Sequence, residues 1–173
     1  MDTNEGHVLG FDPGSRNSAY ASMIHSNGIF YFNDIGDIEL TDDEFGGRIS
    51  KMAQRVSDLI NKHNPSFICY ESVLFGRNVT NALNTAKIIG AIEFAAYTQS
   101  VTSIGYPPQK IKKIITDNGR ASKYEMKENV SKLIDANKSN EDEFWHTHAS
   151  NHIIDACAIG IVGLQLYDRQ NKE

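Results

Sequence analysis

Two short apolar segments of this chain each end on a carboxylate, and the repetition limits the folds open to it. His7-Val8-Leu9-Gly10-Phe11 runs into Asp12 and the turn residues Pro13-Gly14, and Phe67-Ile68-Cys69-Tyr70 runs into Glu71. Apolar runs of this length bounded by turn residues indicate buried strands. Each strand would then deliver an acid at its end, and hard divalent cations prefer such carboxylate oxygens as ligands.

Helical and extended patterns alternate along the rest of the sequence. Thr41-Asp42-Asp43-Glu44 resembles a capped helix start, and Asn64-Pro65 ends the helical spacing that follows. Ser26-Asn27-Gly28 predicts a tight turn between two strands. We therefore expect an α/β domain with a mixed five-stranded central sheet flanked by helices. The expected strands cover 7–12, 17–25, 29–32, 67–70 and 101–104. The expected helices cover 41–63, 80–97, a basic turn from 107, 123–134 and 152–167.

Composition indicates one soluble globular domain over residues 1–173, with a core over about 7–167. Of the 173 residues, 40% are hydrophobic and 23% charged, and the longest apolar stretches are too short to span a membrane. The N-terminus lacks the features of a signal peptide, and Cys69 and Cys157 form no disulfide framework. We expect a reduced, cytoplasmic protein with a mobile polar loop over 135–146.

The chain is acidic overall, but its basic residues are concentrated in a few segments. The net charge of -5 and the pI near 5.7 argue against binding of nucleic acid through bulk charge. The bases are concentrated in three short segments, 76–77, 109–113 and 119–123. A nuclease is not excluded, because a metal site needs clustered acids and a local basic surface contacts phosphates.

A further pair of candidate metal ligands lies near the C-terminus. His152 and Asp155 stand at i and i+3, so they share one face of a helix that is otherwise apolar. With Asp12 and Glu71 they form a set in which two metals stabilise the attacking and leaving oxygens of a phosphodiester displacement. Simpler interpretations exist: an Asx-turn for Asp12, a salt bridge for Glu71, and a packed or capping histidine for His152.

The basic segments supply candidate phosphate contacts. We assign Lys112, Arg120 and Lys123 to this role, although a lysine is more commonly a solvated surface charge. The helix start at 119–123 adds backbone N–H groups, which suit a phosphate.

The segment after Glu71 supplies candidate base contacts. Phe75 and Arg77 follow the acid on an expected exposed loop, where an aromatic ring stacks on a base or wedges into a junction. The alternative is that Phe75 folds back onto the core. His146 and His148 lack the Cys/His spacing of a zinc site, so we interpret their segment as a solvated loop.

These motifs together resemble the RuvC family of Holliday-junction resolvases, within the ribonuclease H-like superfamily. The resemblance runs in order over residues 7 to about 166, which is nearly the whole chain. Four segments carry it: 10–16 for the first-strand motif, 70–90 for the second acidic motif and the helix after it, Lys112 to Lys123 for the basic segment, and 152–158 for the C-terminal metal-site pair.

The resemblance implies a crossover junction endodeoxyribonuclease of DNA recombination and repair. It would bind a four-way junction as a homodimer and nick two strands of like polarity symmetrically. Two Mg²⁺ or Mn²⁺ ions per active site would activate water and leave ligatable 5′-phosphate ends. Asp12 would bridge both metals, Glu71 and Asp155 would hold one each, and His152 would complete a site or position water.

The implied dimer suits the implied substrate, because a two-fold symmetric substrate is best met by a symmetric dimer. We expect the helix over 78–97 to supply much of the contact, since it offers more small and apolar surface than one sheet face needs. The residues concerned are Ala82, Ala86, Ile89, Phe94 and Ala95.

Two positions depart from the family pattern. Many members carry Asp where this chain has His152, and the junction-contacting Phe of bacterial members aligns with Leu74, beside Phe75. Substrate handling is therefore expected to differ from that of the bacterial enzymes. The short chain, acidic pI and divergent middle look more like a phage member, which would act in the host cytoplasm.

Two other function classes are open on sequence alone. A nucleotide-binding ATPase of the actin and sugar-kinase type also begins with a strand, an Asp and a Gly turn. It needs a second lobe, for which 173 residues leave no room. A non-catalytic junction-binding module would be expected to have lost an acid of the site, and none is missing. A cleavage assay on synthetic four-way junctions separates these classes.

Overall fold

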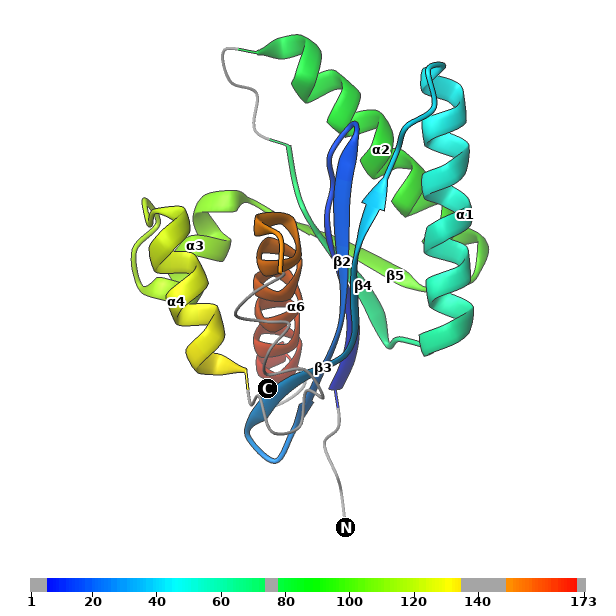
Figure 1. Ribbon diagram of the computed structural model, residues 1–173. Coiled ribbons are helices and arrows are strands. Elements are labelled where there is room, and N and C mark those ends of the chain that lie inside the picture. The colour runs from blue at the N-terminus through cyan, green and yellow to red at the C-terminus, as the bar shows by residue number, and fades with distance from the viewer. Residues whose placement is uncertain (1–5, 74–77, 135–148, 171–173) are drawn as a thin grey trace.

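A mixed sheet lies at the centre of the computed structural model, which describes residues 6–73, 78–134 and 149–170, with side chains as far as 167 (Figure 1). The sheet has five strands in the order β3-β2-β1-β4-β5. The first three form an antiparallel meander, and β4 and β5 continue the sheet parallel to β1. The strands are β1 (Gly6–Asp12), β2 (Asn17–Ser26), β3 (Ile29–Glu39), β4 (Phe67–Glu71) and β5 (Thr102–Tyr106).

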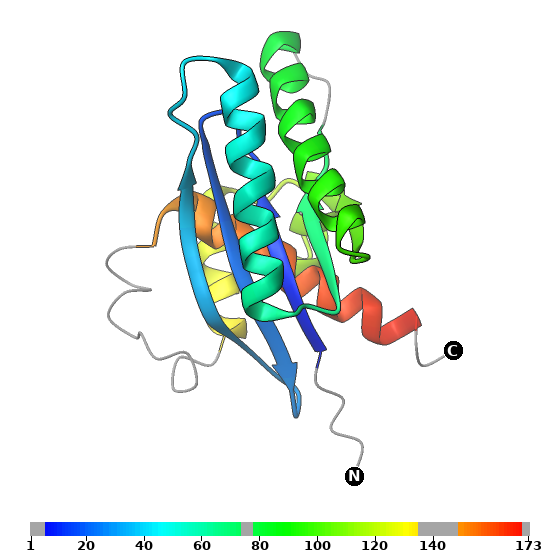
Figure 2. The same ribbon diagram turned by 90° about the vertical axis from the view of Figure 1, so that its right-hand side faces the viewer.

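Helices cover both faces of the sheet, as Figures 1 and 2 show from two sides. One face is covered by α1 (Phe45–His63) and α2 (Val79–Thr98). The other is covered by α6 (Asn151–Gln170), with α3 (Pro108–Thr116) and α4 (Lys123–Leu133) outside it. The predicted α/β architecture with a mixed five-stranded sheet is confirmed. None of the helices in the described part of the chain combines the length and apolarity that a membrane span needs.

The alternation of side chains along each strand divides the core into two clusters and determines which face of the sheet Asp12 and Glu71 occupy. Val8 belongs to the buried cluster under α6, and Leu9 belongs to the cluster under α1 and α2. Residues of β4 alternate in the same way. Continuing this two-residue period turns both Asp12 and Glu71 toward the α6 face. Because β1 and β4 are parallel neighbours with Phe11 opposite Tyr70, the two acids end adjacent strands.

Glycines allow α6 to lie directly on the strands. A Cβ on Gly10 would lie 2.8 Å from the backbone nitrogen of Gly160 and closer still to the carbonyl oxygen of Ala156. A Cβ on Gly163 would lie 2.8 Å from Sγ of Cys69. The helix therefore approaches β1 and β4 more closely than larger residues permit, which brings its first turn to the strand ends.

Three sequence expectations need correction or fall outside the described residues. β3 runs to Glu39 rather than ending at 32, because its pairing with β2 continues past an irregularity at Ser22 and Met23. The expected cap at Thr41 to Glu44 is wrong: α1 begins at Phe45, and the Glu44 side chain makes no capping hydrogen bond. The loop at 135–146, His146, His148, Leu74, Phe75 and Arg77 lie outside the described residues.

Candidate active site

The turn after Asp12 is fixed by buried polar groups. The Ser18 hydroxyl accepts a hydrogen bond from the Gly14 N–H and donates one to the Gly14 carbonyl, both at 2.9 Å. Arg48 is buried, and its Nη1 donates to the Ser15 carbonyl at 3.5 Å. The chain beyond the first acid is therefore held by its own donors and acceptors, which leaves the Asp12 carboxylate for another partner.

That partner is His152, at the start of α6. His152 Nδ1 lies 2.6 Å from Asp12 Oδ2, and the two residues are 140 positions apart in the chain. The Asp12 side chain is 15% exposed and that of His152 is 45% exposed, so the pair lies at the protein surface with the acid beneath the imidazole. This hydrogen bond is the leading cause that raises the pKa of His152 above its ordinary value. The Asx-turn interpretation of Asp12 is thus not needed to explain its position.

Ser150 positions the first turn of α6. Its hydroxyl accepts a hydrogen bond from the Ile153 N–H at 3.2 Å, as a helix N-cap does, and donates one to Asp37 on β3 at 2.7 Å. The helix start is therefore attached to the sheet edge two residues before His152. Sequence reasoning missed this residue, although a serine just before an apolar helical run is a recognisable cap signal.

Glu71 and Asp155 are carboxylates that the protein does not neutralise. Burial, reinforced by the charges of Asp12 and Asp155, raises the pKa of Glu71 to about 7. Burial and then the charge of Asp12 raise the pKa of Asp155 to about 6. Among the described residues, neither acid forms an ion pair with a lysine or arginine. The alternative of a salt bridge for Glu71 therefore has no partner there.

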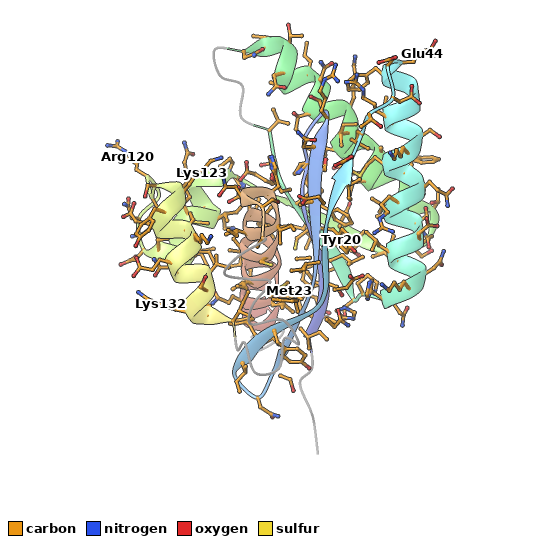
Figure 3. All side chains as sticks on the ribbon, in the orientation of Figure 1. Tyr20, Met23, Glu44, Arg120, Lys123 and Lys132 are labelled. Atoms are coloured by element: carbon orange, nitrogen blue, oxygen red, sulfur yellow. The ribbon has the colours of Figure 1, made fainter. Side chains whose placement is uncertain are left out.

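Two lysines lie near the acids without pairing with them. Lys112 lowers the pKa of Glu71 through its charge, yet its Nζ donates to the Ala121 carbonyl at 2.8 Å. Lys123 acts in the same way on Asp155. Figure 3 shows Lys123 and Arg120 at the same end of α4, with Arg120 extending outward and Lys132 at the other end.

The helix start at 119–123 differs from the sequence expectation. The Arg120 N–H donates to the Asn118 side chain at 3.0 Å, and the Ser122 N–H donates to the Glu125 carboxylate at 2.7 Å. Glu125 and Ser122 form a reciprocal capping box that also uses the Glu125 N–H. These backbone donors are engaged within the protein, so the segment offers a phosphate its cationic side chains rather than these N–H groups.

A cavity of about 380 Å³ opens beside Glu71. It separates the end of β4 from the first turns of α2 and α3, and amide and hydroxyl side chains contribute to its wall. Its lining consists of Pro13, Glu71, Ser72, Val73, Asn78, Asn81, Ala82, Thr85 and Pro108. The acid cluster is thus accessible from this side.

The fold brings together all four residues that the sequence predicts as metal ligands. Three carboxylates and one imidazole form a donor set of the kind that Mg²⁺ or Mn²⁺ accepts. Burial and then the charges of neighbouring acids raise the pKa values of Glu71 and Asp155, and a bound cation would favour their charged forms. Within the described ranges, no three His, Cys, Asp or Glu side chains already converge on one point, so ligation by three of them requires side-chain rotation.

The sheet order, the helical layers and the acids at the ends of β1 and β4 together define a nuclease of the ribonuclease H-like class. A model of the family described as crossover junction endodeoxyribonuclease RuvC matches residues 8–162. The chain therefore belongs to the RuvC family of enzymes. Nucleases of this fold generally depend on divalent metal ions.

Individual relatives agree with the family match. The crossover junction endodeoxyribonuclease RuvC of Oleidesulfovibrio alaskensis is 30% identical over 134 residues, which cover 78% of this chain and 81% of the relative. That of Treponema denticola is 28% identical over 162 residues, which cover 93% and 86%. The structure of T. thermophilus RuvC in complex with Holliday junction substrate superposes with a TM-score of 0.82 at 21% identity, covering 96% of both chains. This likeness confirms the ribonuclease H-like fold.

Proposed function

We propose that this protein is a metal-dependent endonuclease that resolves four-way DNA junctions by symmetric nicking of two strands. One observation carries the proposal: three carboxylates lie near the ends of β1 and β4, and two of them, Glu71 and Asp155, have raised pKa values and no lysine or arginine partner among the described residues. Such a cluster is unfavourable unless it binds cations. Because the chain belongs to the RuvC family, we infer that the substrate on which the bound cations act is branched DNA.

Each site residue has a distinct part in the proposed reaction. The charge of Asp12 acts on both other acids, so Asp12 would contact two Mg²⁺ or Mn²⁺ ions, while Glu71 and Asp155 would each hold one. When bound, the ions supply positive charge to the phosphate as negative charge develops on its oxygens. His152 holds Asp12 by a hydrogen bond at 2.6 Å and would complete a metal site or orient water.

The basic residues would place the DNA strand. Lys112 and Lys123 act electrostatically on the acids from α3 and α4, so a phosphate entering between them meets cations before it meets carboxylates. Arg120 extends outward at the same end of α4 and suits a neighbouring phosphate (Figure 3). Phe75 and Arg77 remain proposed DNA contacts.

We propose a homodimer that uses one exposed face of α2. Val79, Leu83, Phe94 and Tyr97 are exposed large apolar residues, and their spacing puts them on one stripe of the helix. The sequence expectation was partly wrong here, because Ala82, Ile89 and Ala95 are buried within their own domain. Light scattering at micromolar concentration tests the dimer, and Phe94→Glu should yield monomers, with Lys132→Ala as the control. A strict monomer, free and on DNA, would contradict the dimer.

The remaining parts of the proposal concern organisation and location. We treat residues 1–173 as one nuclease domain and assign its activity to the cytoplasm. Cys69 and Cys157 are free and buried, which supports a reducing compartment.

Cleavage of labelled synthetic DNA tests the proposed activity. A four-way junction, a flap, a Y structure and a linear duplex would be compared with Mg²⁺, with Mn²⁺ and with a chelator. We expect paired nicks in the junction with either metal and none with the chelator. Junction binding without any metal-dependent cutting would overturn the proposed activity and favour a non-catalytic junction-binding module.

A further inference from the structure

Tyr124 is an exposed aromatic residue that the proposed function leaves unexplained. Its side chain lies in the first turn of α4 and is 76% exposed. Of the large apolar residues that are exposed in the described part of the chain, four belong to the α2 stripe. Another, Tyr167, stacks on Phe67 with ring centroids 4.9 Å apart. Tyr124 belongs to neither arrangement.

The surroundings of Tyr124 are basic. Lys123 precedes it and acts electrostatically on Asp155 and His152, so the first turn of α4 lies at the rim of the acid cluster. Both acids of α4 are already engaged: Glu125 closes the capping box, and Glu128 forms an ion pair with Lys132 at 2.7 Å. The exposed ring therefore stands beside Lys123, and Lys127 lies three residues further along the same helix.

Helix geometry separates the roles of the two adjacent side chains. Successive residues of an α-helix are about 100° apart around its axis. Lys123 lies close enough to Asp155 to lower its pKa, so Tyr124 lies on the neighbouring face of the same turn, at the border of the site. A single strand that passes over the acids would present a phosphate to Lys123 and a base or sugar to the ring.

We propose that Tyr124 is an aromatic contact for a nucleobase of the DNA strand that Lys123 holds over the acid cluster. The inference rests on the proposed function. A flat apolar ring with cations beside it suits a ligand that carries both a π-face and negative charge, and a nucleic-acid strand has both. The base next to the cleaved phosphodiester, rather than intact duplex, would be the ligand, because stacking requires an accessible base face.

Substitutions that keep or remove the aromatic ring test this contact. We expect Tyr124→Ala and Tyr124→Leu to weaken junction binding by about 5- to 100-fold, the range for loss of a base–aromatic contact. Tyr124→Phe and Tyr124→Trp should bind as wild type does. Lys132→Ala is the matched control, because the Lys132 side chain is 66% exposed and lies in the last turn of the same helix. Melting temperatures of all five variants should stay at the wild-type value.

Fluorescence gives a second readout. The chain has one tryptophan, Trp145, so the difference between Tyr124→Trp and wild type reports on position 124. We expect this difference signal to be quenched when a four-way junction binds and not when a linear duplex binds. Wild-type affinity of both Tyr124→Ala and Tyr124→Leu, or an equal loss in Lys132→Ala, would overturn the contact while junction cleavage by the wild type still stands. A wild-type protein that binds no branched DNA would overturn the proposed function and the contact together.

Discussion

Acids on opposite faces of the sheet are treated in opposite ways. On the face covered by α1, the Asp34 carboxylate accepts hydrogen bonds from Lys62 and His63, both at 2.8 Å, and from the Tyr20 hydroxyl at 3.1 Å. Burial alone raises the pKa of Asp34, but these hydrogen bonds together outweigh it and hold the pKa below its ordinary value. At the end where β1 stops, the pKa values of Glu71 and Asp155 are raised to about 7 and about 6.

The difference separates an acid that holds the fold together from acids that serve a reaction. Asp34 is neutralised by the protein's own cations, so its charge is used within the molecule. Near Glu71 the available cation, Lys112, donates instead to the Ala121 carbonyl. The carboxylates of the site are therefore available to bind a ligand, and their unpaired charge lowers the free energy of unfolding.

The largest expected effect is on rate, and it is confined to the un-neutralised acids. Asp12→Asn, Glu71→Gln or Asp155→Asn should reduce junction cleavage by at least ~10²-fold while binding stays near the wild-type level, because metal ligands act on the transition state and phosphate contacts provide affinity. Gel-shift and cleavage assays measure both. Asp34→Asn is the control and should cut at the wild-type rate. Near-normal cutting by Asp12→Asn would remove the distinction between the two groups.

Stability should change in opposite directions in the two groups. In the metal-free protein the pKa of Glu71 is about 7 against an ordinary 4.5, so its contribution to stability falls as pH rises from 4.5 through 7. Glu71→Gln should thus raise the free energy of unfolding at pH 7.5 by about 1–3 kcal/mol, since one pKa unit corresponds to ~1.4 kcal/mol. The gain should vanish near pH 4.5.

Asp34→Asn should have the reverse effect. The lowered pKa of Asp34 means that its stabilising contribution is present above the ordinary value of 3.8 and is lost as pH falls below it. We expect a loss of about 1–2 kcal/mol at pH 7.5, from weaker hydrogen bonds to charged groups. Urea unfolding with a chelator at both pH values measures the two variants. A loss of stability in Glu71→Gln at pH 7.5 would mean that this acid also supports the fold.

The lysines near the two sets of acids differ in the same way as the acids do. Lys62 neutralises Asp34, whereas Lys112 and Lys123 lie beside the site acids without pairing with them. Lys112→Ala and Lys123→Ala should each weaken junction binding and reduce the salt dependence by roughly one unit of slope. Lys112→Ala should also loosen the turn at Ala121. Lys132→Ala is the matched control on α4, and an unchanged slope in both test variants would assign these lysines to solvated surface.

The smallest expected effect concerns His152. Its pKa is raised chiefly by the hydrogen bond with Asp12, and a ligating imidazole must be unprotonated, so activity should fall as pH decreases through that raised value. His152→Asp should reduce this acid-side loss and lower the Mg²⁺ requirement, whereas wild type should favour Mn²⁺. Rate against metal concentration at several pH values compares the two. Superimposable curves would show that His152 is not a ligand.

Local patterns made the acids predictable, and long-range packing made the rest unpredictable. Strand ends and an i, i+3 pair identified Asp12, Glu71, His152 and Asp155, because each signal lies within a few residues. The Asp12–His152 contact was not foreseen, since it depends on how closely α6 packs on Gly10. The Asp34 cluster was missed because its partners come from β2 and α1, and α2 showed the same problem, since burial under a neighbouring helix decided which apolar residues stayed exposed.

Synthesis of the chain separates the two halves of the site in time. Asp12 and His152 are 140 positions apart, and ribosomes add ~5–20 residues per second, so the second half follows the first by roughly 7–30 s. Until α6 docks against Gly10, the emerging polypeptide holds Asp12 and Glu71 without the other two residues. On the proposed mechanism, an incompletely synthesised chain therefore does not cleave the DNA in its compartment, because it lacks His152 and Asp155.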